Sequence, residues 1–245
     1  MKKILVVGES CRDIFCYGTA NRLCPDAPAP VFNFFEQIEN PGMAMNVYNN
    51  ILAIGHDVEI YTNMNWEDIT KTRFIEYNAN HMFMRYDIND NMYERCDIEK
   101  IDYEKYEAIV ISDYNKGFLS NEDIEQVGLN HDCVFLDTKK KLQSWVDSIT
   151  FIKINDFEYG RNRDFIITNK MENKVIVTLG SDGAEFNSVR YGVPKVGIRD
   201  VAGAGDSFIA GLVTKYTQTT DIVKAIEFAN QCATKVVQKR GVSTI

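Results

Sequence analysis

The sequence lacks the features of several large classes of protein. It has no apolar run near 18 residues, so it predicts no membrane-spanning helix. Of its 245 residues 27 are basic and 35 acidic, which gives a formal net charge of −8. With no summed positive field to gather a phosphate backbone, general nucleic-acid binding is not expected. Proline is scarce, with five residues, and neither a repeat nor a Pro/Gly/Ser-rich linker divides the chain.

Cysteine and histidine are few and poorly spaced for disulfides or metals. The six cysteines form no Cys-x-x-Cys pair, and the three histidines are scattered. We therefore expect reduced, mostly buried thiols and no zinc site. The apolar run at residues 4–7 is followed by Glu9 and Arg12, which is typical of a first β-strand rather than a signal peptide. These features predict a soluble, cytoplasmic protein.

Short, continuous apolar runs recur along the chain and predict strands that are buried on both faces. They lie at residues 4–7, 58–61, 108–111, 133–136, 151–154 and 175–179. Helical patterns separate several of these runs, with one expected helix at 43–54 that ends at Gly55 and a shorter one at 121–128. Alternating strands and helices indicate an α/β fold with a mainly parallel central sheet and helices on both faces.

The last third of the chain predicts two helices. Apolar residues at 208, 209, 212, 213 and 216 form a helical stripe. Asp221 is expected to cap a second helix, which would carry Lys235, Lys239 and Arg240 in its last turns and end at Gly241.

Two segments do not fit this alternation. Residues 31–37 alternate weakly and residues 81–87 alternate apolar with polar, so we expect them to be antiparallel strands of a small lid outside the main sheet. The apolar Met82-Phe83-Met84 edge either faces a partner subunit or packs within the lid itself.

The segment with the clearest chemistry is Gly203-Ala204-Gly205-Asp206. A Gly-Ala-Gly turn at the start of a helix lets backbone N–H groups converge on an anion. An aspartate placed there would repel a phosphate if the only task were to bind an anion. Its presence makes sense if Asp206 takes the proton of a hydroxyl group that attacks the phosphate. The alternative is that Asp206 only caps the helix. Neither Gly-x-x-x-x-Gly-Lys-Ser/Thr nor Gly-x-Gly-x-x-Gly occurs, so the two common nucleotide motifs are absent.

This segment resembles the C-terminal motif of the ribokinase/PfkB carbohydrate kinases, which transfer the γ-phosphoryl group of ATP to a sugar hydroxyl. The resemblance runs over residues 6–245. It is greatest to the subfamily that acts on D-glycero-D-manno-heptose 7-phosphate, through Cys16-Tyr17-Gly18, residues 21–31, Ile111-Ser112-Asp113-Tyr114-Asn115-Lys116-Gly117 and Gly241-Val242-Ser243-Thr244-Ile245. It implies a single ribokinase-like α/β domain over 1–245, a mainly parallel sheet flanked by helices, and a small antiparallel β lid with strands from about 12–40 and 81–97.

The resemblance also implies ATP, Mg²⁺ and a role for each matching residue. Asp206 corresponds to the catalytic base, and Gly203, Ala204 and Gly205 to the anion hole around the transferred phosphoryl group. Asn155 and Glu158 would organise Mg²⁺ and the phosphates, with Glu158 acting on the metal through water. Residues implied at the nucleotide are Asn155, Glu158, Thr178, Gly180, Ser181, Gly183 and Asn230. Residues implied at the sugar or its phosphate are Asp13, Gly42, Asn46, Asp113, Lys116 and Lys139.

Some of these residues have a plainer interpretation. An Asn-x-x-Glu motif is often only a helix cap. The run Lys139-Lys140-Lys141 is also typical of charged residues that are exposed to solvent and bind nothing. A monovalent cation near Asp200 is a candidate that the sequence leaves open.

The chain departs from the family pattern at three places. Met43 replaces the second glycine of the sugar motif, Gly8-Glu9-Ser10 stands where the family usually has Gly-Asp, and residues 61–71 are shorter than usual. These departures bear on the substrate more than on the fold or on ATP.

The sequence therefore predicts an ATP- and Mg²⁺-dependent kinase of a sugar or sugar phosphate, with the anomeric hydroxyl of heptose 7-phosphate as the leading acceptor. The alternatives are a family kinase of an unphosphorylated sugar or nucleoside, and a non-catalytic sugar- or nucleotide-binding homologue. The expected partners are these small molecules and a second copy of the chain in a homodimer, with no nucleic acid and no membrane.

Overall fold

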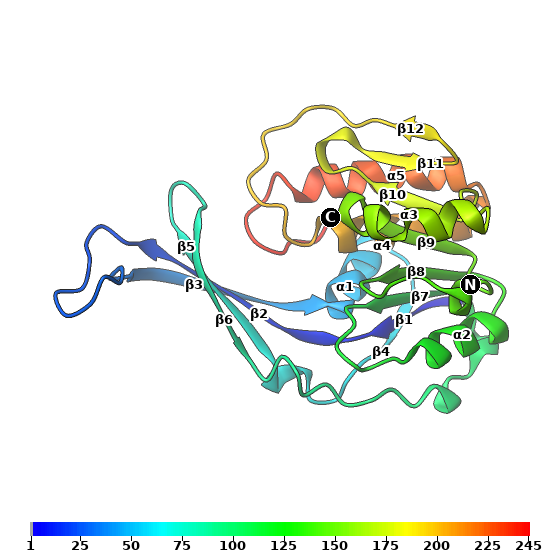
Figure 1. The fold of residues 1–245 in the computed structure, drawn as a ribbon, viewed down its shortest axis with the longest axis horizontal. Coiled ribbons are helices and arrows are strands. Elements are labelled where there is room, and N and C mark those ends of the chain that lie inside the picture. The colour runs from blue at the N-terminus through cyan, green and yellow to red at the C-terminus, as the bar shows by residue number, and fades with distance from the viewer. Residues whose placement is uncertain (1) are drawn as a thin grey trace.

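A computed structural model describes residues 2–245 as a large sheet covered by helices and a smaller sheet that projects from it (Figure 1). The large sheet has eight strands, in the spatial order β12 (Val189–Tyr191), β11 (Ala184–Phe186), β10 (Val175–Thr178), β9 (Phe151–Asn155), β8 (Val134–Thr138), β7 (Tyr106–Asp113), β1 (Lys3–Gly8) and β4 (Val58–Tyr61). The pairings from β4 to β10 are parallel, and only β11 and β12 add antiparallel pairs. The expected mainly parallel α/β sheet is confirmed.

Five α-helices cover the two faces of this sheet. They are α1 (Ala44–Ile54), α2 (Asn121–Asn130), α3 (Asp156–Thr168), α4 (Ala204–Thr219) and α5 (Ile222–Val236). Successive residues of a strand point to opposite faces, so Leu5 and Val7 pack with α2 and α3 while Ile4 and Val6 pack with α1, α4 and α5. Burial on both faces is the reason why these strands read as continuous apolar runs.

Short 3₁₀ turns occupy several of the connections. They lie at Trp66–Asp68, Ile98–Lys100, Tyr103–Lys105, Ser144–Val146 and Gly180–Asp182. No helix within residues 2–245 is long and apolar enough to cross a membrane. All six cysteines are free thiols.

The smaller sheet forms the lid, in the order β3 (Asn33–Met43), β2 (Ser10–Thr19), β5 (Thr70–Glu76) and β6 (Met82–Ile88). Its β2–β3 and β5–β6 pairs are antiparallel, and β2 runs parallel to β5. Only Glu9 separates β1 from β2, and β3 leads directly into α1, so the lid is continuous with the main sheet at the site described below.

The structure differs from the expected boundaries in three details. Strand β5 lies outside the stretches expected for the lid, and residues 89–97 hold no strand. The sequence does not reveal β5 because Lys71 and Arg73 occupy inward-facing positions of this strand, where apolar residues would indicate a strand. Helix α5 begins after its Asp221 cap as expected, but it ends at Val236 rather than at Gly241, because the Val237 carbonyl accepts the N–H groups of residues 199 and 200.

Candidate active site

The Gly-Ala-Gly turn opens α4 at the carboxyl edge of the main sheet. Gly203 is the N-cap of the helix and has φ +77°, a conformation that favours glycine. A Cβ at Gly203 would lie 2.8 Å from Asn46 Nδ2, and one at Gly205 would lie 2.8 Å from Lys153 Nζ. Because glycine has no side chain, the Asn46 amide and the Lys153 ammonium group can approach the N-terminus of α4. The first N–H groups of a helix find no carbonyl acceptor within the helix. This arrangement suits an anion.

Asp206 lies in the first turn of α4 and is 7% exposed. One of its oxygens accepts a hydrogen bond from Asn46 Nδ2 and the other from the Tyr114 hydroxyl, each at 2.8 Å. Burial raises the pKa of Asp206 to about 6, although both hydrogen bonds and the nearby Lys153 ammonium act in the opposite direction. Because its partners are side chains and the cap is Gly203, Asp206 is not the N-cap of α4.

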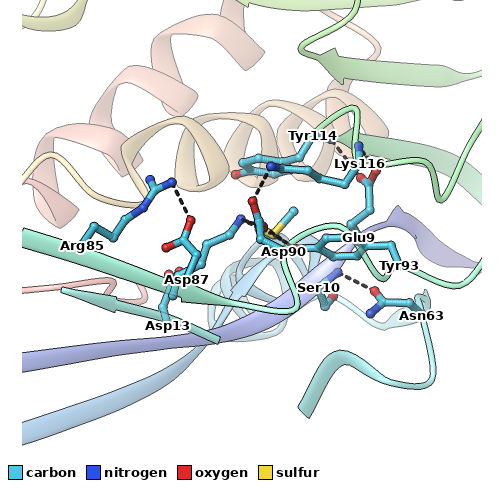
Figure 2. Close-up of polar contacts among 12 residues, drawn as sticks. Glu9, Ser10, Asp13, Asn63, Arg85, Asp87, Asp90, Tyr93, Tyr114 and Lys116 are labelled. Carbon is cyan, nitrogen blue, oxygen red and sulfur yellow. Dashed lines mark hydrogen bonds and ion pairs between the residues drawn. The ribbon is translucent and has the colours of Figure 1, made fainter. Parts of the chain in front are cut away.

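The partners of Asp206 are themselves held in place. Asn50 Nδ2 donates to Asn46 Oδ1 at 3.1 Å, which turns the Asn46 amide nitrogen toward Asp206. The buried Glu9 carboxylate accepts the N–H groups of Tyr114 and Lys116, each at 2.9 Å, and so anchors the loop after β7 (Figure 2). Burial, together with the nearby Asp113 carboxylate, raises the pKa of Glu9.

A buried ion pair stands beside the helix N-terminus. Lys153 of β9 is 2.7 Å from Asp137 Oδ2 on β8, and both side chains are buried. The other oxygen of Asp137 is buried and accepts no hydrogen bond, with Lys139 Nζ 3.8 Å away. An unpaired buried carboxylate oxygen costs free energy unless something binds it. The site thus offers both a cation and a free carboxylate oxygen.

Asn155 and Glu158 form a capping box at the start of α3. The Glu158 N–H donates to Asn155 Oδ1 and the Asn155 N–H donates to Glu158 Oε2, each at 2.8 Å. Both residues of the motif thus cap α3, and the second oxygen of Glu158 is paired with Lys139 Nζ at 2.5 Å. Lys139 is ion-paired with Glu158 and Lys140 with Asp113, whereas Lys141 is exposed.

The carboxylates around this point fit Mg²⁺. Within residues 2–245 no three His, Cys, Asp or Glu side chains gather as a metal-binding cluster. One or two carboxylate oxygens are enough for Mg²⁺, which keeps several waters and takes the remaining ligands from phosphates. The unpartnered oxygen of Asp137 and the carboxylate of Glu158 are the candidate protein ligands.

Two adjoining cavities meet at this site. A mostly apolar cavity of about 400 Å³ is bounded by the loop after β10 and by α4 and α5. It is lined by all five residues expected at the nucleotide loop and adenine, namely Thr178, Gly180, Ser181, Gly183 and Asn230. A polar cavity of about 420 Å³ shares Thr178, Gly180 and Gly205 with it and contains Tyr114, Asp137, Lys139, Lys153, Asn155 and Asp206. The mostly apolar cavity thus adjoins a polar cavity that holds the Asp206 carboxylate.

The residues expected at the sugar fall into two groups. Asp13 of β2 and Gly42 of β3 meet within the lid, where a Cβ at Gly42 would lie 2.1 Å from Asp13 Oδ2, whereas Asn46 of α1 contacts Asp206. Asp13 is ion-paired with Arg73 of β5. Asp113, in contrast, is buried against Lys140 and is not among the residues that line the two cavities. Lys116 is ion-paired with Asp90 in the turn after β6, and Lys139 lines the polar cavity.

Met43 takes the backbone conformation that the expected glycine would provide. It precedes α1 with φ +61° and ψ −129°, a region where a side chain is strained. Its side chain is buried, and Sδ accepts a hydrogen bond from Lys71 Nζ at 3.2 Å. The bulky side chain therefore lies against the lid, and Met43 is not among the residues that line the polar cavity.

Sequence reasoning missed Tyr114, Asp137 and Lys153, which touch Asp206 or line the polar cavity. Lys153 did leave a signal, because a lysine interrupts the apolar strand run Phe151-Ile152-Lys153-Ile154. A charge buried in a strand needs a partner and often marks a site. Tyr114 directly follows β7 and Asp137 is the last residue but one of β8, and α/β proteins gather functional residues at these carboxyl ends of parallel strands.

Comparisons with known proteins identify relatives of the chain. Residues 45–245 match the pfkB family carbohydrate kinase domain. The chain is 27% identical to a protein named bifunctional protein HldE of Helicobacter pylori (strain G27), over 98% of this chain and 64% of that protein. A protein of the same name from a Nitratiruptor species is 28% identical over 99% of this chain and 63% of its own length. The chain thus spans slightly less than two thirds of these relatives.

Solved structures share the fold over nearly the whole chain. A nucleoside kinase of the ribokinase family from Methanocaldococcus jannaschii superposes with a TM-score of 0.73 at 16% identity, covering 99% of this chain and 93% of its own. Ribokinase of Arabidopsis thaliana, solved with ribose and ATP, superposes with a TM-score of 0.74 at 13% identity, covering 98% and 94%. The ribokinase-like fold is confirmed.

Proposed function

Because the chain belongs to the pfkB family of carbohydrate kinases, we propose that it transfers the γ-phosphoryl group of ATP to the anomeric hydroxyl of D-glycero-D-manno-heptose 7-phosphate. The observation that carries the proposal is the carboxylate of Asp206, buried in the first turn of α4 and held there by Asn46 and Tyr114. The subfamily motifs and the likeness to the HldE proteins over 98% of the chain support the heptose acceptor.

In this mechanism Asp206 acts as the general base. The acceptor hydroxyl gives its proton to the Asp206 carboxylate as its oxygen bonds to the γ-phosphorus of ATP. The bond from that phosphorus to the oxygen bridging the β- and γ-phosphates breaks at the same time, and ADP leaves with this oxygen. Asn46 fixes the orientation of the base, while the Tyr114 hydroxyl has to yield its place on the second oxygen to the acceptor.

Charge on the transferred phosphoryl group is stabilised by groups already in place. Gly203, Gly205 and the Lys153 side chain line the polar cavity, while the N–H of Ala204 already donates to the Val201 carbonyl. Fixed dipoles and charges of this kind supply much of the stabilisation in phosphoryl transfer. Mg²⁺ held by Glu158 and Asp137, directly or through water, would neutralise phosphate charge. The apolar cavity with Asn230 would take the adenine and ribose.

A panel of acceptors tests the proposal. ADP release would be measured with ATP, Mg²⁺ and heptose 7-phosphate, hexose phosphates, ribose 5-phosphate, free sugars and nucleosides. We expect the highest kcat/KM for heptose 7-phosphate. A preference for a free sugar or nucleoside would make the chain a different kinase of the same family. ATP binding by calorimetry without ADP release for any acceptor would indicate a non-catalytic homologue.

The pKa of Asp206 predicts the pH dependence of the reaction. The base works only when it is ionised, and its pKa is raised to about 6 in the protein without substrates. The value of kcat/KM should therefore fall about tenfold per pH unit below that pKa and reach a plateau above it. Steady-state rates from pH 5 to 8, corrected for ATP and acceptor ionisation, would check this. A flat profile down to pH 5 would contradict the assignment of the base.

We also propose a homodimer that pairs through the lid. Large apolar side chains are exposed on β3 and β6, among them Phe34, Phe35, Met82, Met84 and Tyr86. An exposed apolar strand surface of this kind invites association. Light scattering at micromolar concentration should give twice the 28.0 kDa mass of the chain, and Met84→Glu should lower it to the monomer value. A monomeric mass for the unchanged protein would contradict the dimer.

A further inference from the structure

The hydroxyl of Tyr114 lies where the proposed mechanism requires the hydroxyl of the acceptor. Asp206 Oδ1 accepts a hydrogen bond from the Tyr114 hydroxyl and Asp206 Oδ2 accepts one from Asn46 Nδ2, each at 2.8 Å. A base takes a proton only from a group within hydrogen-bond distance. Because Asp206 is only 7% exposed and both of its oxygens are engaged, an attacking hydroxyl has to take the place of one of these two partners.

The two partners of Asp206 are held in different ways. Asn46 belongs to a network, since Asn50 Nδ2 donates to Asn46 Oδ1 at 3.1 Å and to the Asn46 carbonyl at 2.8 Å. The Tyr114 hydroxyl, in contrast, bonds to no residue of 2–245 other than Asp206. Displacing the tyrosine hydroxyl therefore breaks one hydrogen bond, whereas displacing Asn46 would disturb a network. The tyrosine is the partner that an acceptor replaces.

The side chain of Tyr114 can make this change while its main chain stays in place. The Tyr114 N–H donates to the buried Glu9 carboxylate at 2.9 Å, which anchors the loop after β7 (Figure 2). The ring lines the polar cavity of about 420 Å³, so it has space to turn away from Asp206. The ammonium groups of Lys71 and Lys139 each lie 5.8 Å from the ring centre and attract the ring toward the site.

A hydroxyl on the base matters because water can replace a sugar in this reaction. A water molecule bound to Asp206 would give its proton to the carboxylate as its oxygen bonds to the γ-phosphorus of ATP. The bond from that phosphorus to the oxygen bridging the β- and γ-phosphates would break, and ADP and inorganic phosphate would leave. Burial and the Asp206 carboxylate raise the pKa of the Tyr114 hydroxyl, so it keeps its proton and remains a donor to the base.

We propose that the Tyr114 hydroxyl takes the place of the acceptor on Asp206 and keeps water from the base, so that ATP is cleaved only when an acceptor displaces the tyrosine. The inference rests on the proposed function, because it takes Asp206 as the base of a phosphoryl transfer. An acceptor offsets the lost hydrogen bond with the binding energy of its other groups, whereas a water molecule has no other groups. Tyr114 is thus a positioning residue that acts through Asp206 and selects a sugar hydroxyl over water.

The test removes the hydroxyl alone and contains no acceptor. ADP release from ATP and Mg²⁺ would be measured for the unchanged protein and for Tyr114→Phe. The variant should hydrolyse ATP at least about tenfold faster, because water no longer competes with a hydrogen bond to a charged group. Adding Asp206→Asn to Tyr114→Phe should abolish this gain. Tyr106→Phe is the matched control, since this hydroxyl bonds to Glu59 at the other end of β7, and it should leave hydrolysis unchanged.

A second measurement does not depend on turnover. Carbon-13 NMR of the aspartate carboxyl groups, with the Asp206 signal identified through Asp206→Asn, would follow the titration of Asp206 in the unchanged protein and in Tyr114→Phe. The loss of a hydrogen bond that favours the carboxylate should raise the pKa of Asp206 above its value of about 6. The variant changes one of the side chains that face Asp206, which are Asn46, Tyr114, Asp137, Lys139 and Lys153.

Several results would overturn the role of Tyr114. They are no gain in hydrolysis by Tyr114→Phe, an equal gain by Tyr106→Phe, a gain that survives Asp206→Asn, or a pKa of Asp206 that the variant leaves unchanged. A fall in hydrolysis would show that the hydroxyl only orients the base. Since these assays contain no acceptor, they are independent of the heptose assignment. If the gain appears and heptose 7-phosphate is not phosphorylated, the proposed acceptor is wrong and the role of Tyr114 stands.

Discussion

Replacing Asp206 with asparagine is expected to slow phosphoryl transfer by about 10²–10⁴-fold, the usual contribution of a general base. Asparagine keeps the size of the side chain and can still bond to Asn46 and Tyr114, but it cannot take the proton of the acceptor. ATP affinity should hold or rise, since a negative charge near the γ-phosphate disappears. Turnover, ATP affinity and melting temperature would be measured on one preparation.

Stability should hardly change in this variant. Because the pKa of Asp206 is raised in the folded protein, its ionisation opposes folding above about pH 6, and asparagine removes that opposition. We expect Tm at pH 8 to be unchanged or higher by up to about 4 °C, near 1 kcal/mol for a chain of this size. Asp164→Asn, on the exposed face of α3, is the matched control and should keep normal turnover. More than about a tenth of normal turnover in Asp206→Asn would remove Asp206 from the role of base.

Replacing Lys153 with methionine is expected to reduce kcat by about 10²–10³-fold, as the loss of one fixed donor to the transferred group does in other enzymes. The ammonium lies against the open face of Gly205 and is paired with Asp137, so its loss also leaves a buried carboxylate without its cation. Breaking such a pair costs about 3 kcal/mol of stability. Denaturant unfolding and steady-state kinetics would measure the two effects.

A double variant separates chemistry from folding at this pair. Lys153→Met with Asp137→Asn removes both charges, so it should recover most of the lost stability while kcat stays low. Asp137→Asn alone should be folded and impaired, because the carboxylate oxygen offered to Mg²⁺ is weakened as a ligand. The loss of one donor is expected to lower kcat by more than about tenfold. If the double variant kept kcat within about tenfold of normal, Lys153 would have only a structural role.

The main sheet could be predicted from the sequence because its strands are buried on both faces. Residues 4–7 and 108–111 are continuous apolar runs, and the structure places them side by side as β1 and β7. Strand β5 could not be predicted in this way, since its inward residues Lys71 and Arg73 serve the site rather than a core. The end of α5 is decided by hydrogen bonds from residues 199 and 200, which no local pattern reveals.

The sequence predicted the residues of the site only where they belong to a local motif. Asp206 and its glycine turn form a local signal, and the structure brings Asn46 to Asp206 from 160 residues away. Tyr114 and Asp137 belong to the site through the order of the parallel strands, which brings the ends of β7, β8 and β9 to one edge of the sheet. Pairing such as that of Lys71 with Asp90 depends on lid geometry, so the sequence gives no sign of it.

The most direct test of the account is ³¹P NMR of the purified chain with ATP, Mg²⁺ and heptose 7-phosphate. We predict that the ATP signals decline as ADP forms, and that a new phosphate resonance coupled to the anomeric proton grows in equal amount while the 7-phosphate signal remains. The same sample with Asp206→Asn should show almost no change over the same time. ADP formed with inorganic phosphate alone, or a new resonance coupled to any proton other than the anomeric one, would contradict the account.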